Sequence, residues 1–391
     1  MKNRTKRFAA LLAALIVAAG STLAMVSCAD EGEGDESSTP TETPAETPAE
    51  TPEESDDIET PEVPDFDFMA EDLTKYITLG RYKDLAISVD EKPTVSDEDI
   101  DMQLNYALIN AKEYITVTDR AVTKNDTVYI KYRGIMDGEE FEGGTGEQDN
   151  FTIFNGGGFI DGFADGIVGA TPGVEKAIDL KFPDNYHAEL AGKPVTFMVT
   201  VVHIYEAKEL TDALAIALTE DETMTAAKLR EEYKKQIEES IDSEYENYKL
   251  DKVWQKIFSE AKELDMPKDL VDGYYNMDVQ YYKTYAAMYG ITYEEVLGMI
   301  GMTDDDIYTR AHDNVFTDMV VYSVIKAENF SITEDEYNEM LKELAATSGY
   351  TEKEILETYT KEKLTDMFTY TKVYEMAPSW QNFTVETPAG E

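Results

Sequence analysis

The sequence predicts an α+β protein with a small antiparallel sheet domain and an all-α domain. Residues 122–206 alternate apolar and polar side chains between glycine-containing turns, which is typical of short antiparallel strands. Residues 208–377 carry apolar side chains at helical spacing behind several capping motifs. Residues 29–71 are polar and proline-rich, with too few apolar side chains to offset the entropy of folding. We therefore expect two folded parts behind a disordered N-terminal tether.

The N-terminus has the three-part layout of a secretory signal, with basic residues within 2–7 and an apolar run at 8–20. That run is too short for a mature membrane span. Small residues then precede Cys28, the chain's single cysteine, as in the processing site of bacterial lipoproteins. We expect residues 1–28 to be a signal peptide ending at a lipidated Cys28, which would hold the protein on the outer face of the bacterial cytoplasmic membrane. Ordinary signal cleavage beside an incidental cysteine is the alternative.

Residues 29–72 form an acidic linker that repeats Thr, Pro, Ala and Glu, and we expect it to act as an extended spacer. The whole chain is acidic, because 34 Lys and Arg stand against 81 Asp and Glu, for a formal net charge of −47. A field of this sign repels phosphate backbones, so neither nucleic acid nor the ribosome is expected as a partner. The acidity either keeps the surface soluble or attracts basic clients.

Residues 73–120 predict a strand and a helix that lead into the sheet domain. Residues with strand preference occupy Tyr76–Val89, and Ser96-Asp97-Glu98-Asp99 has the form of a helix N-cap. Apolar residues follow at helical spacing from Ile100 onward. Order is expected to begin near Tyr76.

The sheet domain is expected at residues 121–207 and the helical domain at 208–380. Turns such as Asp137-Gly138 separate the strands of the first. In the second, one long helix or a broken pair should end at Met266-Pro267, because proline interrupts helices. Later helices are predicted behind capping motifs that begin at Thr292, Thr303, Thr333 and Thr351.

Four motifs in the sheet domain carry a family resemblance. Val128–Gly134 and Asp137–Gly144 resemble the opening of FKBP-type peptidyl-prolyl isomerases in the trigger-factor branch. Phe159–Gly166 resembles the segment that leads onto the single short helix of that family, and Phe182–Lys193 resembles its loop before the last strand. The resemblance implies an FKBP-like fold that catalyses rotation about X-Pro bonds.

The helical region is similar to the C-terminal, SurA-like chaperone domain of trigger factor, and the likeness spans roughly residues 76–375. The ribosome-docking loop of that family has no counterpart in the sequence. The signal, the lipidation cysteine and the acidic tether stand in its place, so we expect no association with the ribosome.

The resemblance implies an apolar proline pocket with Phe163 as its floor and Phe141 and Phe197 as walls. The Tyr186 hydroxyl and the Ile160 backbone N–H are implied as donors to the client's carbonyl. The complete set of implied site residues is Tyr132, Phe141, Glu142, Phe151, Phe159, Ile160, Phe163, Tyr186 and Phe197.

Each of these residues also has a structural explanation, since aromatic side chains in a small sheet domain commonly form its core. Glu142 holds the family's acidic position beside the pocket, where it would orient Tyr132 or polarise the site, but it also fits a solvated turn. Asp161 would add a negative charge at the pocket rim and alter client preference.

No cofactor and no metal is expected for this chemistry. Rotation about a peptide bond is slow because the twisted state loses amide resonance, at a barrier of about 18–20 kcal/mol. An apolar pocket that takes the proline ring out of water and supplies a few donors to the carbonyl needs no nucleophile.

A Tyr- and Met-rich stretch at residues 274–289 is either helix core or a groove for unfolded clients. The sequence thus predicts a monomeric prolyl isomerase and ATP-independent chaperone for exported, unfolded or proline-containing polypeptides, joined to the membrane by its lipid. Two rival hypotheses are a holdase with a degenerate pocket and a surface lipoprotein with one specific partner. A solute-binding lipoprotein is disfavoured, because the two-lobed α/β repeat is missing.

Overall fold

A computed structural model describes residues 66–183, 186 and 190–386. The predicted signal peptide, Cys28 and most of the predicted tether lie outside the described residues. The described chain forms two compact units. We call them the helical unit, residues 66–77, 263–290 and 307–370, and the sheet unit, residues 78–262, 291–306 and 371–386.

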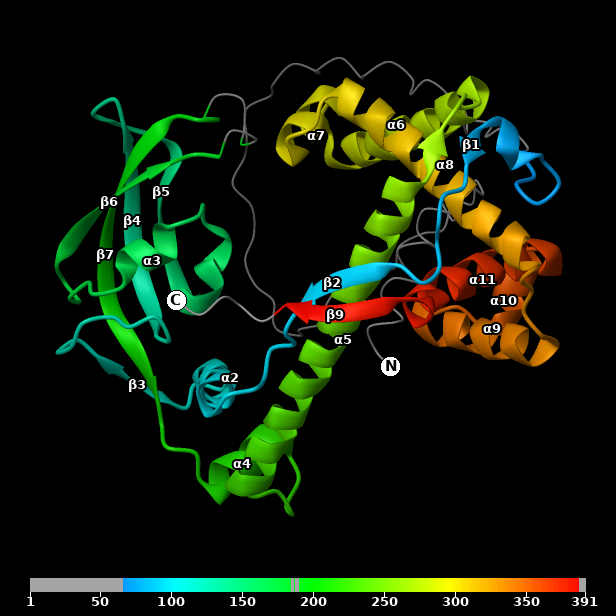
Figure 1. Ribbon diagram of the computed structural model, residues 1–391. Coiled ribbons are helices and arrows are strands. Elements are labelled where there is room, and N and C mark those ends of the chain that lie inside the picture. The colour runs from blue at the N-terminus through cyan, green and yellow to red at the C-terminus, as the bar shows by residue number, and fades with distance from the viewer. Residues whose placement is uncertain (1–65, 184–185, 187–189, 387–391) are drawn as a thin grey trace, which may run out of the picture. The chain divides into compact units, whose positions relative to one another are not determined.

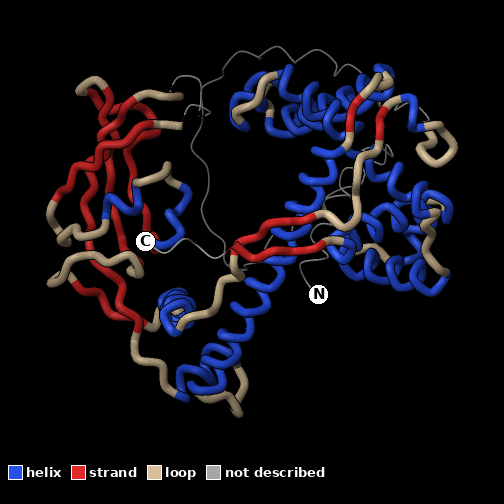
Figure 2. Tube along the Cα trace, viewed as in Figure 1, coloured by secondary structure: helices blue, strands red, loops and turns tan. Residues whose placement is uncertain are grey.

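An antiparallel sheet dominates the sheet unit (Figures 1 and 2). Its strand order is β3-β7-β4-β5, and β6 pairs with part of β7. The bounds are β3 Tyr114–Val117, β4 Thr127–Met136, β5 Glu139–Thr152, β6 Glu175–Lys181 and β7 Pro194–Ala207. With the helices described below, the sheet confirms the predicted α+β class.

Local sequence determines the β4–β5 hairpin. Asp137 and Gly138 both have positive φ, at 53° and 87°. Two successive residues in the left-handed region are typical of a type I′ turn, whose twist matches that of the flanking strands. The predicted turn is thereby confirmed.

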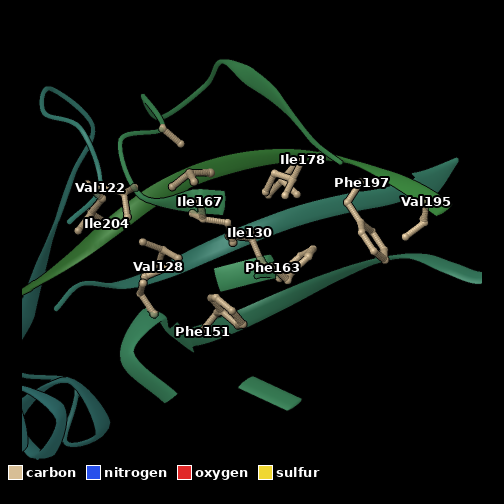
Figure 3. Close-up of a cluster of buried hydrophobic side chains, with 14 of the residues drawn as sticks. Val122, Val128, Ile130, Phe151, Phe163, Ile167, Ile178, Val195, Phe197 and Ile204 are labelled. Atoms are coloured by element: carbon tan, nitrogen blue, oxygen red, sulfur yellow. The ribbon is translucent and has the colours of Figure 1, made fainter. Parts of the chain in front are cut away.

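One short helix, α3 (Phe163–Ile167), follows the 3-10 turn η2 (Ile153–Gly158). Figure 3 shows Phe163 and Ile167 pointing toward the apolar side chains of the sheet. Period-two alternation along β4 and β7 brings Ile130 and Phe197 to this face. The domain core therefore lies between the sheet and α3.

The sheet unit also contains α2 (Asp97–Asn110), α4 (Asp212–Thr219), α5 (Ala226–Glu260), α7 (Tyr293–Ile300) and η3 (Ala377–Trp380). Ser96 and Asp99 form the predicted capping box of α2. The expectation that the long helix ends at Met266-Pro267 is wrong. Helix α5 ends at Glu260, and Pro267 instead precedes the first residue of α6. Proline suits that place because the first N–H groups of a helix have no intrahelical partner.

A parallel strand pair that the sequence did not predict joins distant parts of the sheet unit. Strand β2 (Ala86–Asp90) pairs with β9 (Asn382–Glu386), with Ile87 opposite Phe383. Just before β9, the Gln381 side chain donates to the carbonyl of Tyr82 at 2.8 Å and accepts from the N–H of Leu85 at 3.0 Å.

The helical unit contains α6, α9 and α10 and most of α8 and α11. The bounds are α6 Lys268–Tyr289, α8 Asp304–Glu328, α9 Glu334–Ser348, α10 Glu352–Thr358 and α11 Lys361–Met376, with η1 at Leu73–Lys75 and the two-residue strands β1 at Ile77–Thr78 and β8 at Lys262–Glu263. Thr333 and Thr351 form the predicted capping boxes of α9 and α10. Leu344, Leu364 and Phe368 lie in its core.

Order begins earlier than the expected Tyr76. The ring of Phe68 stacks on Tyr322 of α8, with centroids 4.7 Å apart. The Lys326 ammonium donates to the carbonyls of Phe68, Met69 and Glu71. The end of the predicted linker is therefore packed against α8, because its two phenylalanines supply apolar surface that the repeat before it lacks. None of the helices among the described residues is long and apolar enough to cross a membrane.

Candidate functional site

The candidate site is a cluster of aromatic rings where α3 meets β4, β5 and β7. Phe163 is its central ring, with 0% of its surface exposed. Its backbone N–H donates to the carbonyl of Ile160 at 3.1 Å, which starts the short helix and aims the ring at the sheet. Phe197 of β7 meets Phe163 edge to face, with centroids 5.1 Å apart and planes at 87°.

Two further predicted residues flank this ring. Tyr132 of β4 and Phe151 of β5 each lie 6.0 Å from Phe163 between centroids, with interplanar angles of 83° and 86°. Edge-to-face pairs of this kind are favoured by the quadrupoles of the rings. The structure therefore brings Tyr132, Phe151, Phe163 and Phe197 together in one cluster.

Phe159 and Ile160 come from the segment between η2 and α3, and both are partly buried against the same core. The ring of Phe159 lies parallel to Phe163, with centroids 4.0 Å apart and planes at 6°. Phe163 is therefore covered by another aromatic ring, and the sequence prediction did not include this stacking.

Phe141 of β5 lies beside this cluster against two glycines. A Cβ at Gly144 would lie 2.6 Å from Cζ of Phe141, and one at Gly134 would also collide with the ring. Phe141 meets Phe182 edge to face, with centroids 6.0 Å apart. The absence of side chains at Gly134 and Gly144 thus leaves the space that the Phe141 ring fills.

Tyr186 contacts Phe182, with centroids 4.9 Å apart and planes at 34°. Its backbone N–H donates to the carbonyl of Pro183 at 3.1 Å, which turns the chain at this point. Tyr186 remains exposed. Its predicted role as a hydroxyl donor, like that of the Ile160 N–H, stays a prediction.

Glu142 follows Phe141 on β5. Its side chain lies outside the described part of the structure, as does Cys28. The predicted orientation of Tyr132 by Glu142 therefore stays a prediction.

Phe182 was missed as a site residue. It is buried and contacts Phe141, Tyr186 and Phe197. The sequence did contain a signal, because Ile178, Leu180 and Phe182 continue the period-two alternation of β6. These three residues lie on the face of the sheet that carries the ring cluster.

The residue after Tyr132 on β4 carries a cluster of ion pairs, and strand alternation turns it to the opposite face of the sheet from the rings. Arg133 of β4 pairs with Glu175 at 3.1 Å and Glu140 at 3.4 Å. The hydrogen bond from Arg133 to Glu175 is the largest cause that raises the pKa of this guanidinium. Asp161 is exposed beside Ile160. Among the described residues, no group of three or more His, Cys, Asp or Glu lies close enough together to hold a metal ion.

A cluster of apolar rings suits binding of a small apolar ring and twisting of an amide, since both need exclusion of water rather than a nucleophile. Residues 118–202 match the family described as FKBP-type peptidyl-prolyl cis-trans isomerase. The sheet unit therefore contains an FKBP-type peptidyl-prolyl cis-trans isomerase domain.

The rest of the chain has its own match. Residues 225–377 match the family described as the C-terminus of bacterial trigger factor protein. The trigger factor of Streptococcus pyogenes serotype M5 (strain Manfredo) is 34% identical over 285 residues, which are 71% of this chain and 66% of the relative. The trigger factor of serotype M4 (strain MGAS10750) is also 34% identical, over 62% of its length.

One solved structure, of the trigger factor chaperone, aligns with this chain at a TM-score of 0.35. Its description is "Promiscuous Substrate Recognition in Folding and Assembly Activities of the Trigger Factor Chaperone". Its identity is 16%, and the alignment covers 78% of this chain and 73% of that one. The chain belongs to the trigger factor family. It spans just under two thirds of the length of the relatives named here.

Proposed function

We propose that the protein catalyses cis–trans isomerisation of X-Pro bonds and holds unfolded polypeptides without ATP. The observation that carries the first activity is the ring cluster around Phe163 within an FKBP-type domain. X-Pro bonds populate both isomers and exchange over tens to hundreds of seconds, which is slow enough to limit folding. A catalyst of this exchange would therefore assist newly unfolded clients.

The rings act by removing water. A proline ring bound among them loses the solvent that stabilises the planar, polar amide, so the twisted bond becomes less costly relative to it. A hydroxyl at Tyr186 would then donate to the client's carbonyl oxygen. This step needs no proton transfer and no covalent intermediate.

The isomerase is tested by a protease-coupled assay on a proline-containing tetrapeptide, with Tyr186→Phe beside wild type. The variant keeps the ring contact with Phe182 and loses the donor, so kcat/KM should fall by roughly three- to tenfold, the worth of one hydrogen bond. Tyr106→Phe on α2 is a matched control, because Tyr106 and Tyr186 are both 36% exposed. No acceleration by folded wild type, with aggregation still suppressed, would leave a holdase with a degenerate pocket.

The proposed holding activity is supported by a stripe along α6. Tyr281, Tyr285, Met288 and Tyr289 are between 41% and 63% exposed. They follow one another at spacings of four, three and one residues, so they share one face of the helix. Tyr274 lies on the same helix but donates to Asp318 at 2.6 Å within the helical unit. The Tyr- and Met-rich stretch thus serves both as core and as exposed surface.

Unfolded polypeptide is the occupant that we propose for this stripe, because tyrosine and methionine give adaptable apolar contact. Replacing Tyr281, Tyr285 and Met288 by serine should weaken suppression of client aggregation and leave isomerase activity on the tetrapeptide unchanged. A matched control replaces Ile115 and Val174, which are exposed in the sheet unit. Equal loss in both variants would assign holding to general surface apolarity instead. Crosslinking to a single dominant protein would favour the specific-partner alternative.

We further propose that the protein acts outside the cytoplasm as a lipoprotein anchored through Cys28. The support is the arrangement of basic residues, apolar run and small residues before that cysteine. Cys28→Ala should release the protein from the membrane fraction and abolish incorporation of labelled fatty acid. Incorporation that persists in Cys28→Ala would overturn the anchor.

A further inference from the structure

The rings at the candidate site form a box with a floor and walls. Phe163 is the floor, and Tyr132, Phe151 and Phe197 stand nearly perpendicular to it, at 83°, 86° and 87°. We call these four residues the ring box. Perpendicular walls around a flat floor leave room above the floor for one more ring that lies parallel to it.

Phe159 supplies that ring. It stacks on Phe163 at 4.0 Å between centroids. It also stands at 87° to Tyr132 and 85° to Phe151, at centroid distances of 4.9 and 5.5 Å. Phe159 therefore lies within the same walls as the floor, and Phe163 has no exposed surface left. Phe159 therefore covers the face of Phe163 on which it stacks.

Two glycines flank the segment that carries Phe159. Gly158 precedes it with φ +80°, and Gly162 follows with φ +86°, both in the left-handed region that glycine adopts without strain. Phe159 itself is only partly buried, whereas Phe163 is completely buried. Phe159 contacts Phe163, Tyr132 and Phe151 through apolar ring surfaces. A bound proline ring can make the same kind of contact in its place.

We infer that Phe159 occupies the proline position in the free protein and turns out of the ring box when a client binds. This inference rests on the proposed isomerase function and adds an internal competitor to it. With this competitor, the apparent association constant of a client equals the intrinsic constant multiplied by the fraction of molecules in which the box is open. The same factor applies to any apolar side chain that enters the box.

The test compares Phe159→Ala with wild type for binding and isomerisation of the proline tetrapeptide. Removing the competitor should lower KM and raise kcat/KM by about three- to tenfold, which corresponds to an open fraction of about a third to a tenth. Phe154→Ala is the control, because Phe154 is an exposed phenylalanine of the preceding turn η2. Its kcat/KM should stay at the wild-type value.

A second measurement applies even if Phe159→Ala fails to fold. Full-length protein with 4-fluorophenylalanine at position 159 should show a ring-shielded ¹⁹F signal that moves toward the solvent-exposed value when the tetrapeptide is added. The same label at position 154 should not move. A signal at 159 that keeps its shielding on peptide binding, or a fall of kcat/KM in folded Phe159→Ala, would make Phe159 a fixed platform and overturn the inference. Failure of the isomerase proposal differs from both, since wild type itself would then be inactive.

Discussion

Two carboxylates of the helical unit are held by tyrosine hydroxyls. Asp318 of α8 accepts from Tyr274 at 2.6 Å and from Tyr370 at 3.0 Å. Asp366 of α11 accepts from Tyr322 at 2.6 Å. Burial, together with the nearby charge of Asp366, raises the pKa of Asp318 to about 6. The two tyrosine hydrogen bonds act in the opposite direction. Asp318 is therefore easier to protonate in the folded chain than in the unfolded chain.

The pH dependence of this residue follows from its raised pKa. The folded chain takes up a proton as pH falls from about 6 toward the ordinary value of 3.8, so the contribution of Asp318 to stability is greatest at low pH and is lost as pH rises through 6. Asp318→Asn should therefore stabilise the helical unit relative to wild type above pH 6, by at most about 3 kcal/mol, and give no gain near pH 4.

Hydrogen exchange of the α8 amides in both proteins at matched pH measures this difference. Comparison with the variant is needed because capping carboxylates respond oppositely. Hydrogen bonds from backbone N–H groups lower the pKa of Glu295 and Glu354, so their contributions are lost as pH falls. An Asp318→Asn effect independent of pH would contradict the prediction.

Gly144 offers a second test at single-residue scale, because its missing side chain leaves room for Phe141. Gly144→Ala should displace that ring, lower kcat/KM for the tetrapeptide several-fold and destabilise the domain by about 1–3 kcal/mol. Gly298→Ala is the control, since a Cβ there meets nothing within 4 Å and alanine favours the helix. Unchanged activity in Gly144→Ala would mean that the position of Phe141 does not matter for catalysis.

The identities of the ring residues could be predicted from motifs, but their packing could not. Phe163 and Phe159 stand four positions apart, and nothing in that spacing says that one covers the other. Stacking depends on the loop geometry between them and on walls supplied by Tyr132 and Phe151 from other strands. Ring orientation is a tertiary property, which explains why the sequence indicated both rings as site residues but not their stacking.

The starts of several helices, by contrast, could be predicted from the sequence. Thr292, Thr333 and Thr351 each accept from the backbone three residues on, while the glutamate at that place accepts in return. Both partners of a capping box lie within one turn, so the sequence alone shows them. Strand β9 has no such local signal, because its partner β2 lies near the opposite end of the chain.

The contribution of β9 to the stability of β2 can be tested by truncation. Removing residues 382–391 deletes β9, so the amides of residues 86–90 should exchange at least about tenfold faster, since their pairing is lost. The amides of β4 should keep their protection. Removing only 387–391 is the control, because it leaves β9 intact. Equal protection of residues 86–90 in both truncations would show that β9 does not stabilise β2.

Net charge acts on the molecule as a whole. With −47 formal charges, the chain should attract cationic clients over distances that salt screens. The association rate of a lysine-rich unfolded client should therefore fall steeply between about 0.02 and 0.5 M salt, whereas that of a neutral client of equal length should change little. Stopped-flow fluorescence measures both rates. Equal salt dependence would reduce the acidity to a solubility effect.

Strand β2 also bears on how the protein itself reaches its native state. Leu85 and Gln381 are 296 positions apart, so β2 leaves the ribosome long before the residues that complete it. Until β9 has been synthesised, β2 lacks this partner strand and the sheet unit stays incomplete. In a chain that stalls before Gln381, β2 stays without its β9 partner. Such an unpaired strand can be bound by a chaperone or cut by a protease. A factor proposed to guard unfolded polypeptides therefore passes through a vulnerable stage of its own.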